Sequence, residues 1–340
     1  MSGYPDRTTP KWVAADSAGR SATRCIPLDG CVEELRSSQD EVMMGIDEAG
    51  RGPTLGPMVY GSAYCRVADL DKLKAMGFAD SKTLTEAKRE ALWADLRASG
   101  FLGWRIRVLH AQEIAAGMLR RPSPYNLNAM SHDAAIGLVR EVIELGVNLR
   151  HLYVDTVGDP EHYQRKLEGI FPSLSITVAK KADSIFPVVS AASICAKVPR
   201  DAILAGWRFE HPSLGDGHAG RRRRRRQGSG HVQDVPLGDD YSWGCGYPGD
   251  KETVRWMKAN LHPLFGWPSV CRFSWGPALE VLEKNPAAHG AVPVAWPDDE
   301  AADQAAQRSA MELFLGKRKR APARRHKLYH DAGLEPVAAW

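Results

Sequence analysis

The stretch at residues 45–61, GIDEAGRGPTLGPMVYG, constrains the fold more than any other part of the chain. An apolar run over residues 42–46 ends in two adjacent carboxylates, Asp47 and Glu48, and a glycine-arginine-glycine turn closed by Pro53 follows. Such a run, ending in acids and a Gly/Pro turn, predicts a buried strand that delivers side chains to a sheet edge. Carboxylates are natural ligands of Mg²⁺ or Mn²⁺, and glycines let a backbone approach a ligand closely. The stretch therefore predicts a metal or ligand site at that edge.

A dinucleotide-binding loop is the alternative for these glycines, because Gly50, Gly52 and Gly56 reproduce part of that fingerprint. The fingerprint requires a helix directly after the glycines. Here Pro53 intervenes and residues 58–67 are strand-like, so the context counts against a dinucleotide site. Paired acids at a strand end are weak evidence alone, since such pairs often belong to a solvated turn.

Strand-like and helix-like segments alternate through the first two thirds of the chain. Further strands are predicted at residues 103–109, 151–154 and 174–178, and helices at residues 69–76, 85–100, 111–118, 126–145, 160–170 and 187–198. The helix at residues 126–145 is predicted to carry an apolar side with Ile136, Val139, Val142 and Ile143. Strands alternating with helices predict an α/β domain.

Two further acids extend the pair in the first strand. Asp155 directly follows the strand at residues 151–154, and Asp183 lies in a polar turn before the last of these helices. We expect these acids to converge with Asp47 and Glu48 at one edge of the sheet. Carboxylates a few ångströms apart repel strongly unless cations neutralise them, which is the physical argument for a bound divalent metal.

The charge and the cysteines narrow the class of protein. The formal net charge of +4 falls to −2 without the six consecutive arginines at residues 221–226, so local patches would have to hold a polyanion. No apolar stretch approaches the ~18 residues of a membrane span, and no membrane partner is expected. The six cysteines form no C-x-x-C pair, which favours a reducing compartment, the cytosol or the nucleus.

Several motifs follow one another in an order typical of one family: GIDEAGRG, DSK, YNLN, AKKADS, GYP and RFSW. In this order they closely resemble the signature of type 2 ribonucleases H, the ribonuclease HII family, and in particular the catalytic A subunits of the eukaryotic enzymes. The resemblance covers residues 41–201 and 241–284. It implies a ribonuclease H-like fold, a mixed five-stranded sheet flanked by helices, with a helical C-terminal extension.

The resemblance also implies a reaction. The chain is expected to cleave the RNA strand of RNA–DNA hybrids and to incise duplex DNA at a single embedded ribonucleotide, leaving 3′-hydroxyl and 5′-phosphate ends. By resemblance, Asp47, Glu48, Asp155 and Asp183 are the catalytic, metal-binding carboxylates. They would hold two Mg²⁺ or Mn²⁺ ions, with Asp47 bridging them.

The expected substrate-binding residues fall into two groups. By resemblance, the backbone of Gly50, Arg51 and Gly52 senses the 2′-hydroxyl that separates RNA from DNA, and Tyr247 packs on the neighbouring sugar. Lys82 of the DSK motif is expected to contact the nucleic-acid backbone.

Asn126 and Asn128 lie at the start of a predicted helix and leave two alternatives open. Their side chains can hydrogen-bond phosphates or sugars, or they can cap the helix.

The chain also departs from the family pattern. Pro199 replaces the usual alanine, with a kink expected in the helix, and Cys245 replaces a serine. The arginine run of residues 221–226 is interpreted as a solvated loop that adds phosphate affinity; a nuclear import signal or a translated remnant without function are the alternatives.

The expected organisation has five parts. They are a disordered lead-in (1–40), the catalytic domain (41–210), an inserted arginine-rich loop (211–240), the C-terminal part of the catalytic region (241–285) and a basic, partner-docking tail (286–340). Two accessory subunits completing a heterotrimer and a nuclear location are further expectations. The alternatives in function are a hybrid-binding scaffold without catalysis, which the four intact acids disfavour, and a related nuclease acting on DNA junctions, which gives no reason for the glycine-arginine-glycine turn.

Overall fold

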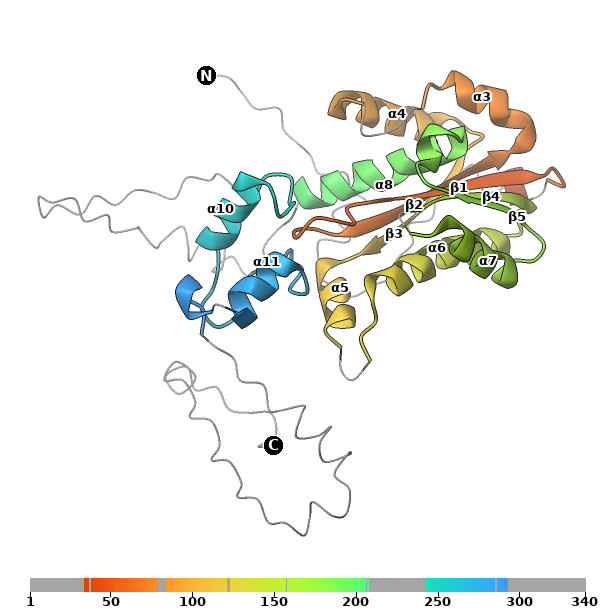
Figure 1. The fold of residues 1–340 in the computed structure, drawn as a ribbon. Helices are drawn as coiled ribbons and strands as arrows, with labels where there is room; N and C mark the ends of the chain where they lie inside the picture. Colours follow the sequence, from red (N-terminus) through yellow and green to blue (C-terminus); the bar gives the residue numbers. More distant parts are fainter. Residues whose placement is uncertain are drawn as a thin grey trace, which may run out of the picture. The chain divides into compact units, whose positions relative to one another are not determined.

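The computed structural model describes residues 34–36, 38–78, 84–120, 123–156, 158–205, 207, 243–284 and 286–292 (Figure 1). The arginine-rich loop, Lys82, most of the N-terminal lead-in and the tail from residue 293 lie outside the described residues. The chain forms two compact units, the first from residues 1–260 and 267–275 and the second from residues 261–266 and 276–340.

The first unit contains a mixed five-stranded sheet. Its strands are β1 (Val42–Ala49), β2 (Met58–Arg66), β3 (Gly103–Leu109), β4 (Leu149–Asp155) and β5 (Ser175–Ala179), in the spatial order β3-β2-β1-β4-β5. β1 pairs antiparallel with β2 and parallel with β4, and β4 pairs parallel with β5. All five predicted strands are present, and the predicted fold class is confirmed. β1 is the central strand and is buried on both faces.

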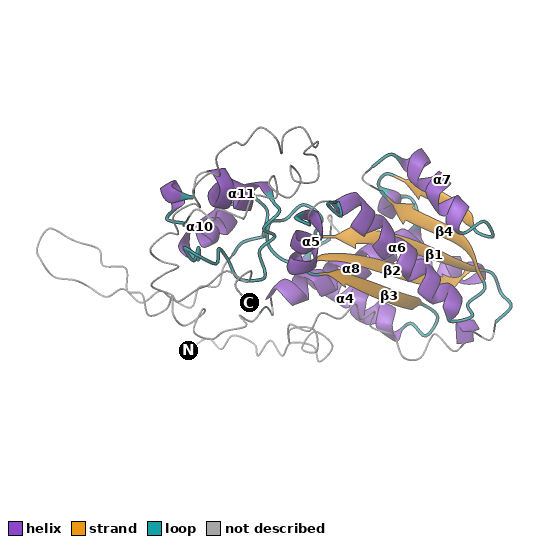
Figure 2. Ribbon diagram, turned by 90° about the horizontal axis from the view of Figure 1, so that it is seen from below, coloured by secondary structure: helices purple, strands orange, loops and turns teal. Residues whose placement is uncertain are grey.

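Helices cover both faces of this sheet (Figures 1 and 2). One face carries α3 (Leu70–Ala75), α4 (Glu86–Ala98) and α8 (Pro187–Ala205), and the other carries α5 (Ala111–Met118), α6 (Leu127–Glu144) and α7 (Pro160–Ile170). Because successive side chains of a strand point to opposite faces, β1 contributes Met43 to the core beneath α8 and Met44 and Ile46 to the core beneath α6.

Helix α8 lies unusually close to β1 and β2. A Cβ atom added to Gly45 would lie 2.4 Å from the carbonyl oxygen of Val188, and one added to Gly61 would lie 2.5 Å from the amide nitrogen of Ala196. The small residues of α8 thus pack against strand glycines. α8 runs to Ala205, seven residues beyond the predicted end at residue 198, and Pro199 does not terminate it.

The start of α6 follows the prediction and one of its face residues does not. Asn126 is the N-cap, and its Oδ1 atom accepts a hydrogen bond from the Ala129 amide at 2.9 Å. Val139 and Val142 are buried as predicted, whereas Ile143 is 40% exposed. The prediction for Ile143 was wrong because it lies one position past the buried stripe of a 3.6-residue period.

Beyond residue 242 the described chain forms short helices. These are α10 (Lys251–Ala259) in the first unit, and α11 (Gly276–Leu279), a π-helical turn (Glu280–Lys284) and the 3₁₀ turn η4 (Ala287–His289) in the second. Two further 3₁₀ turns, η1 (Val67–Asp69) and η2 (Ala182–Ser184), belong to the first unit. Among the described helices, none is long and apolar enough to cross a membrane.

Candidate active site

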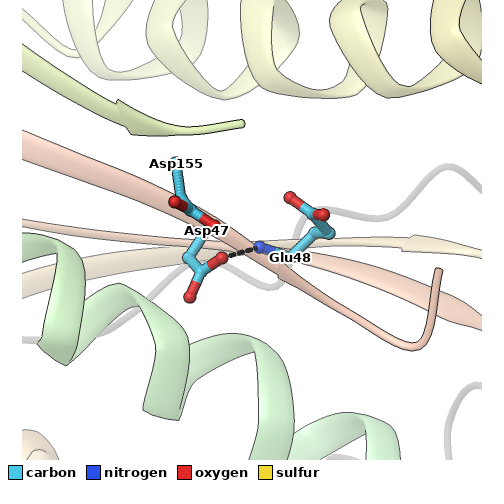
Figure 3. A group of neighbouring side chains, drawn as sticks. All are labelled: Asp47, Glu48 and Asp155. Atoms are coloured by element: carbon cyan, nitrogen blue, oxygen red, sulfur yellow. Dashed lines mark hydrogen bonds between the residues drawn. The ribbon is translucent and has the colours of Figure 1, made fainter. Parts of the chain in front are cut away.

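Three carboxylates meet at one edge of the sheet (Figure 3). Asp47, Glu48 and Asp155 each offer one ligand oxygen, and these atoms all lie within 4.8 Å of one another. β1 and β4 are parallel neighbours, so their C-terminal ends lie at the same edge and bring together acids more than 100 positions apart in sequence. The convergence predicted for these three acids is confirmed.

The two adjacent acids of β1 point to opposite faces of the sheet. Figure 3 shows the Asp47 carboxylate directed toward α8 and the Glu48 carboxylate toward α6. This follows from the two-residue period of a strand. Asp47 is buried with 6% of its surface exposed, whereas Glu48 is half-buried and lines a groove under α6 and α7. The acidic group therefore has one carboxylate buried beneath α8 and one that lines a groove on the opposite face of the sheet.

Asp183 lies outside the group of three but close enough to interact with it. It is buried in η2, and its charge contributes to raising the pKa of Asp47. Hydrogen bonds connect η2 to β4 and to α8. The Ala182 amide donates to Asp155 Oδ1 at 2.8 Å, and Ser190 Oγ of α8 donates to the Asp183 carbonyl. Lys181, which precedes the turn, adopts a left-handed conformation with φ 56°.

The electrostatics of the centre fit a bound cation. Burial raises the pKa of Asp47 well above its usual range, and the charges of Glu48, Asp155 and Asp183 raise it further. The hydrogen bond from the Glu48 amide to Asp47 Oδ1, at 2.7 Å, offsets part of this effect. A set of oxygen ligands that repel one another is the donor chemistry that Mg²⁺ or Mn²⁺ requires. Asp47, Glu48 and Asp155 are suited to hold such an ion.

We predict that Asp47→Asn stabilises the metal-free protein while removing a carboxylate that is suited to bind a metal ion. Because the raised pKa means that ionised Asp47 is a cost to the fold, the free energy of unfolding in EDTA at pH 7 should rise by roughly 0.5–2 kcal/mol, as for other substitutions that relieve strain at a functional site.

Denaturant unfolding at several pH values checks this. The difference in the free energy of unfolding between Asp47→Asn and the wild type should shrink as the pH falls, because Asp47 of the wild type becomes protonated. Mg²⁺ should stabilise the wild type more than the variant. An equal or lower stability of Asp47→Asn in EDTA at pH 7 would contradict the assignment of repulsion to this centre.

The glycine-arginine-glycine turn follows β1 directly. Gly50 has φ 80°, and a Cβ atom there would lie 2.6 Å from the Pro57 carbonyl oxygen, so the position requires glycine. A Cβ atom on Gly52 would lie 3.1 Å from Cε1 of Tyr247. The structure thus places the ring of Tyr247 next to Gly52, although the two residues are nearly 200 positions apart in sequence. Tyr247 is 47% exposed and can offer its ring to a ligand.

Arg51 turns back toward helix α6. Its Nη1 atom donates to Ser131 Oγ at 2.7 Å and its Nη2 atom donates to Asn128 Oδ1 at 2.5 Å. The side-chain oxygens of Asn126 and Asn128 are both engaged within the protein, one as a helix cap and one by Arg51. The cap interpretation therefore holds for Asn126, and a substrate contact by either residue remains a prediction that would use its amide nitrogen.

Beside Glu48 and Asp155 lies a groove between β4, α6 and α7. The side chains that line it include several that the motifs did not single out: Tyr60, Thr156, Asp159, His162 and Tyr163. His132 also lines the groove and stacks on Tyr163 with ring centroids 3.9 Å apart. Burial and the nearby Lys166 lower the pKa of His132 to about 4, so this ring is neutral at pH 7. Tyr60 lies at the site because it pairs opposite Glu48 in the β1–β2 ladder. The sequence motifs do not predict this register, so they could not single out Tyr60.

Acids at the carboxyl edge of a mixed sheet with the order β3-β2-β1-β4-β5, covered by helices on both faces, define a nuclease of the ribonuclease H-like class. The family model described as ribonuclease HII matches residues 44–227. The chain belongs to the ribonuclease HII family, and the resemblance inferred from the motifs is confirmed.

Curated relatives and one solved structure support this assignment. The chain is 41% identical to the A subunit of ribonuclease H2 from Homo sapiens over 302 residues, covering 88% of this chain and 91% of that protein. It is 45% identical to the A subunit of ribonuclease H2 from Arabidopsis thaliana over 258 residues, covering 76% and 77%. The crystal structure of ribonuclease H2 from Pyrococcus horikoshii matches with TM-score 0.52 and 26% identity, covering 71% of this chain and 96% of that one.

Proposed function

We propose that this chain is the catalytic subunit of a ribonuclease H2 that hydrolyses the RNA strand of RNA–DNA hybrids and incises 5′ of a single ribonucleotide in duplex DNA. The observation that carries the proposal is the placement of the glycine-arginine-glycine turn directly after the two acids of β1. A group that senses the sugar and a group that serves the phosphodiester are thereby fixed on one short segment.

The chemistry at the phosphodiester would be hydrolysis that leaves 3′-hydroxyl and 5′-phosphate ends. Asp47, Glu48 and Asp155 would hold divalent ions, with Asp183 beside them. Such ions lower the pKa of an attacking water and stabilise a leaving oxygen, and two of them is the number expected for phosphodiester cleavage of this kind. The role of the chain is to fix these carboxylates at the ends of β1 and β4, where the sheet holds them in place.

Discrimination of RNA from DNA requires a contact with the 2′-hydroxyl. The turn of Gly50, Arg51 and Gly52 would supply main-chain groups for that contact, and the ring of Tyr247 beside Gly52 would pack on the adjacent sugar. The close approach of ring and glycine supports this arrangement, because a side chain at position 52 would occupy the space between them.

Gly52→Ala tests this contact. The added Cβ atom would lie 3.1 Å from the Tyr247 ring, so the ring or the turn must shift. We expect a loss in kcat/KM of at least about tenfold on a duplex with one ribonucleotide, since misplacement near the chemistry by ~1 Å costs on the order of 100-fold.

Gly249→Ala is the matched control, because a Cβ atom there meets nothing within 4 Å. Cleavage rates of both variants against the wild type decide the matter. Equal rates for Gly52→Ala and Gly249→Ala would remove Gly52 and Tyr247 from the proposed sensor.

The proposed function itself is tested by cleavage of a DNA duplex that carries one ribonucleotide, in Mg²⁺, with an all-DNA duplex as the control. The chain is assayed alone and co-expressed with candidate accessory subunits. Cutting 5′ of the ribonucleotide that requires the divalent ion supports the proposal. Intact duplex in both formats would favour a hybrid-binding scaffold, and cutting of both duplexes would favour a nuclease that ignores the 2′-hydroxyl.

The relatives are named as A subunits, which supports a place for this chain in a larger assembly. We expect two accessory subunits in a heterotrimer, docked partly through the C-terminal region. A role in removing ribonucleotides and RNA primers during DNA replication, in the nucleus, is part of the same proposal. The basic run of residues 317–320, KRKR, supports nuclear import.

A further inference from the structure

Arg272 is a fully buried arginine on the inner side of the glycine-arginine-glycine turn, with 0% of its surface exposed. Its guanidinium donates to three main-chain carbonyls: Nη2 to Gly50 at 2.5 Å, Nη1 to Arg51 at 2.9 Å and Nε to Gly56 at 2.9 Å. One side chain thus binds two carbonyls of the turn and a third at Gly56, four residues beyond Gly52. Only a planar fork with several fixed donors can do this.

Trp275 extends the same set of contacts. Its Nε1 atom donates to the Gly52 carbonyl at 2.9 Å, and the Arg272 guanidinium carbon lies 4.7 Å from the centroid of its ring. The carbonyls of Gly50, Arg51 and Gly52 are therefore all held by side chains of the RFSW segment, residues 272–275. This segment lies more than 200 positions from the turn in sequence.

The main chain ties the Tyr247 loop to the same framework. The amides of Thr54 and Leu55 donate to the Gly246 carbonyl at 2.7 and 3.2 Å, and the Arg272 amide donates to the Thr54 carbonyl at 2.9 Å. The turn, the loop that carries Tyr247 and the RFSW segment consequently form one hydrogen-bonded unit. A shift of Arg272 would move all three.

The burial of this charge is costly. All three acceptors of the guanidinium are neutral carbonyl oxygens rather than carboxylates, and burial together with the nearby Arg200 lowers the pKa of Arg272 to about 9. A buried charge is generally less favourable for stability than a well-packed apolar side chain of similar volume. Stability alone therefore does not account for an arginine at this position.

The orientation of the turn gives a reason for it. In a planar trans peptide the N–H group points opposite to the preceding carbonyl. Because the carbonyls of Gly50 and Arg51 point at Arg272, the amides of Arg51 and Gly52 point away from it. Among the described residues, neither amide is found donating to another group of the protein. Both are available to a ligand.

We propose that Arg272, with Trp275, is a positioning residue that fixes the amides of Arg51 and Gly52 toward the substrate sugar and thereby sets recognition of the ribonucleotide. This inference rests on the proposed function and names the device that keeps its sensor rigid. Both side chains bind main-chain carbonyls of the turn, so both act through it.

The test compares Arg272→Lys with Arg105→Lys in single-turnover cleavage of the single-ribonucleotide duplex. Lysine keeps the charge but cannot span three separate carbonyls. Arg105 is a second buried arginine, on β3, and its guanidinium pairs with Glu141 at 3.3 Å rather than with the carbonyls of the turn, which makes it the control for replacing a buried guanidinium.

We expect the rate constant of Arg272→Lys at saturating enzyme to fall on the order of 100-fold, and that of Arg105→Lys to stay within twofold of the wild type. As long as folded enzyme remains saturating, a partial loss of folded protein leaves this rate constant unchanged, so a misplaced turn and a partly unfolded variant are told apart. Trp275→Phe, which removes only the Nε1 donor, should lower the rate constant roughly fivefold and serves if Arg272→Lys does not fold.

If the wild type cleaves and Arg272→Lys cleaves with the same rate constant, the inference is overturned. If Arg272→Lys does not fold, an unchanged rate constant in Trp275→Phe overturns it instead. A wild type that leaves the duplex intact overturns the proposed function and the inference with it.

Discussion

Asp155→Asn is expected to lower the cleavage rate by at least about 1,000-fold, because losing a carboxylate that we propose as a metal ligand would remove several kcal/mol of charge stabilisation from the reaction centre. The substitution keeps the shape of the side chain and an oxygen that can still accept the hydrogen bond from the Ala182 amide. The turn that carries Asp183 should therefore stay in place. What is lost is one negative charge from the group formed with Asp47 and Glu48.

Asp159→Asn is the matched control for this variant. Asp159 lines the same groove, but it caps α7 by accepting from the Glu161 amide at 3.1 Å and is not a member of the acidic group. Asparagine is as good a cap as aspartate, so we expect cleavage close to that of the wild type.

Hybrid binding, measured by fluorescence anisotropy in EDTA, separates a defect in chemistry from a defect in affinity. Asp155→Asn should bind the hybrid within a few-fold of the wild type. A loss of binding as large as the loss of cleavage, or cleavage that persists in Asp155→Asn, would contradict the role assigned to this carboxylate.

Gly45→Ala is expected to have the largest effect on stability. The added methyl group would lie 2.4 Å from the Val188 carbonyl oxygen and 2.6 Å from the Val189 amide nitrogen, both backbone atoms of α8. Backbone cannot rotate away as a side chain can, so α8 must separate from β1 along their contact. Overpacking of this kind costs about 1–3 kcal/mol, and more where neighbouring elements must shift.

The same displacement should reduce activity. β1 carries Asp47 two residues beyond Gly45, and α8 begins three residues after η2, which carries Asp183. Moving the helix away from the strand would pull these acids apart. We therefore expect a lower midpoint of thermal unfolding together with a lower cleavage rate in the remaining folded protein.

Gly137→Ala provides the comparison for Gly45→Ala. Gly137 lies within α6, and a Cβ atom there meets nothing within 4 Å. Alanine in a helix is favoured over glycine, so this variant should be stabilised by roughly 0.4–1 kcal/mol. Thermal unfolding of the two variants would refute the close packing of α8 on β1 if both shifted in the same direction by the same amount.

Local pattern was sufficient to predict the elements and the acids. Each strand and helix depends on the periodicity of its own residues, so the predicted sheet segments and the helices at residues 111–118 and 160–170 agree with the structure. An acid at the end of an apolar run can also be recognised from neighbouring residues alone, as for Asp47 and Asp155. The family resemblance added the expectation that these acids share one site, which local pattern alone could only favour.

Contacts between segments that are far apart in sequence could not be predicted from local hydrophobic patterns. The sequence did not show that Glu48 faces a groove lined by Tyr60 and Tyr163, because that groove depends on which strands and helices become neighbours. Nor did it show that Ile143 lies outside the buried stripe of α6, where a small error in helical phase decides exposure.

What the sequence by itself determined is the order of strands and helices, the four carboxylates and the turn that follows β1, since each of these is written in consecutive residues. The tertiary structure decided how the turn is held and what it faces. Tyr247 reaches Gly52, and Arg272 binds the carbonyls of the turn, only because segments about 200 positions apart pack together. Such contacts are fixed by the folding of the whole chain, and no local periodicity encodes them.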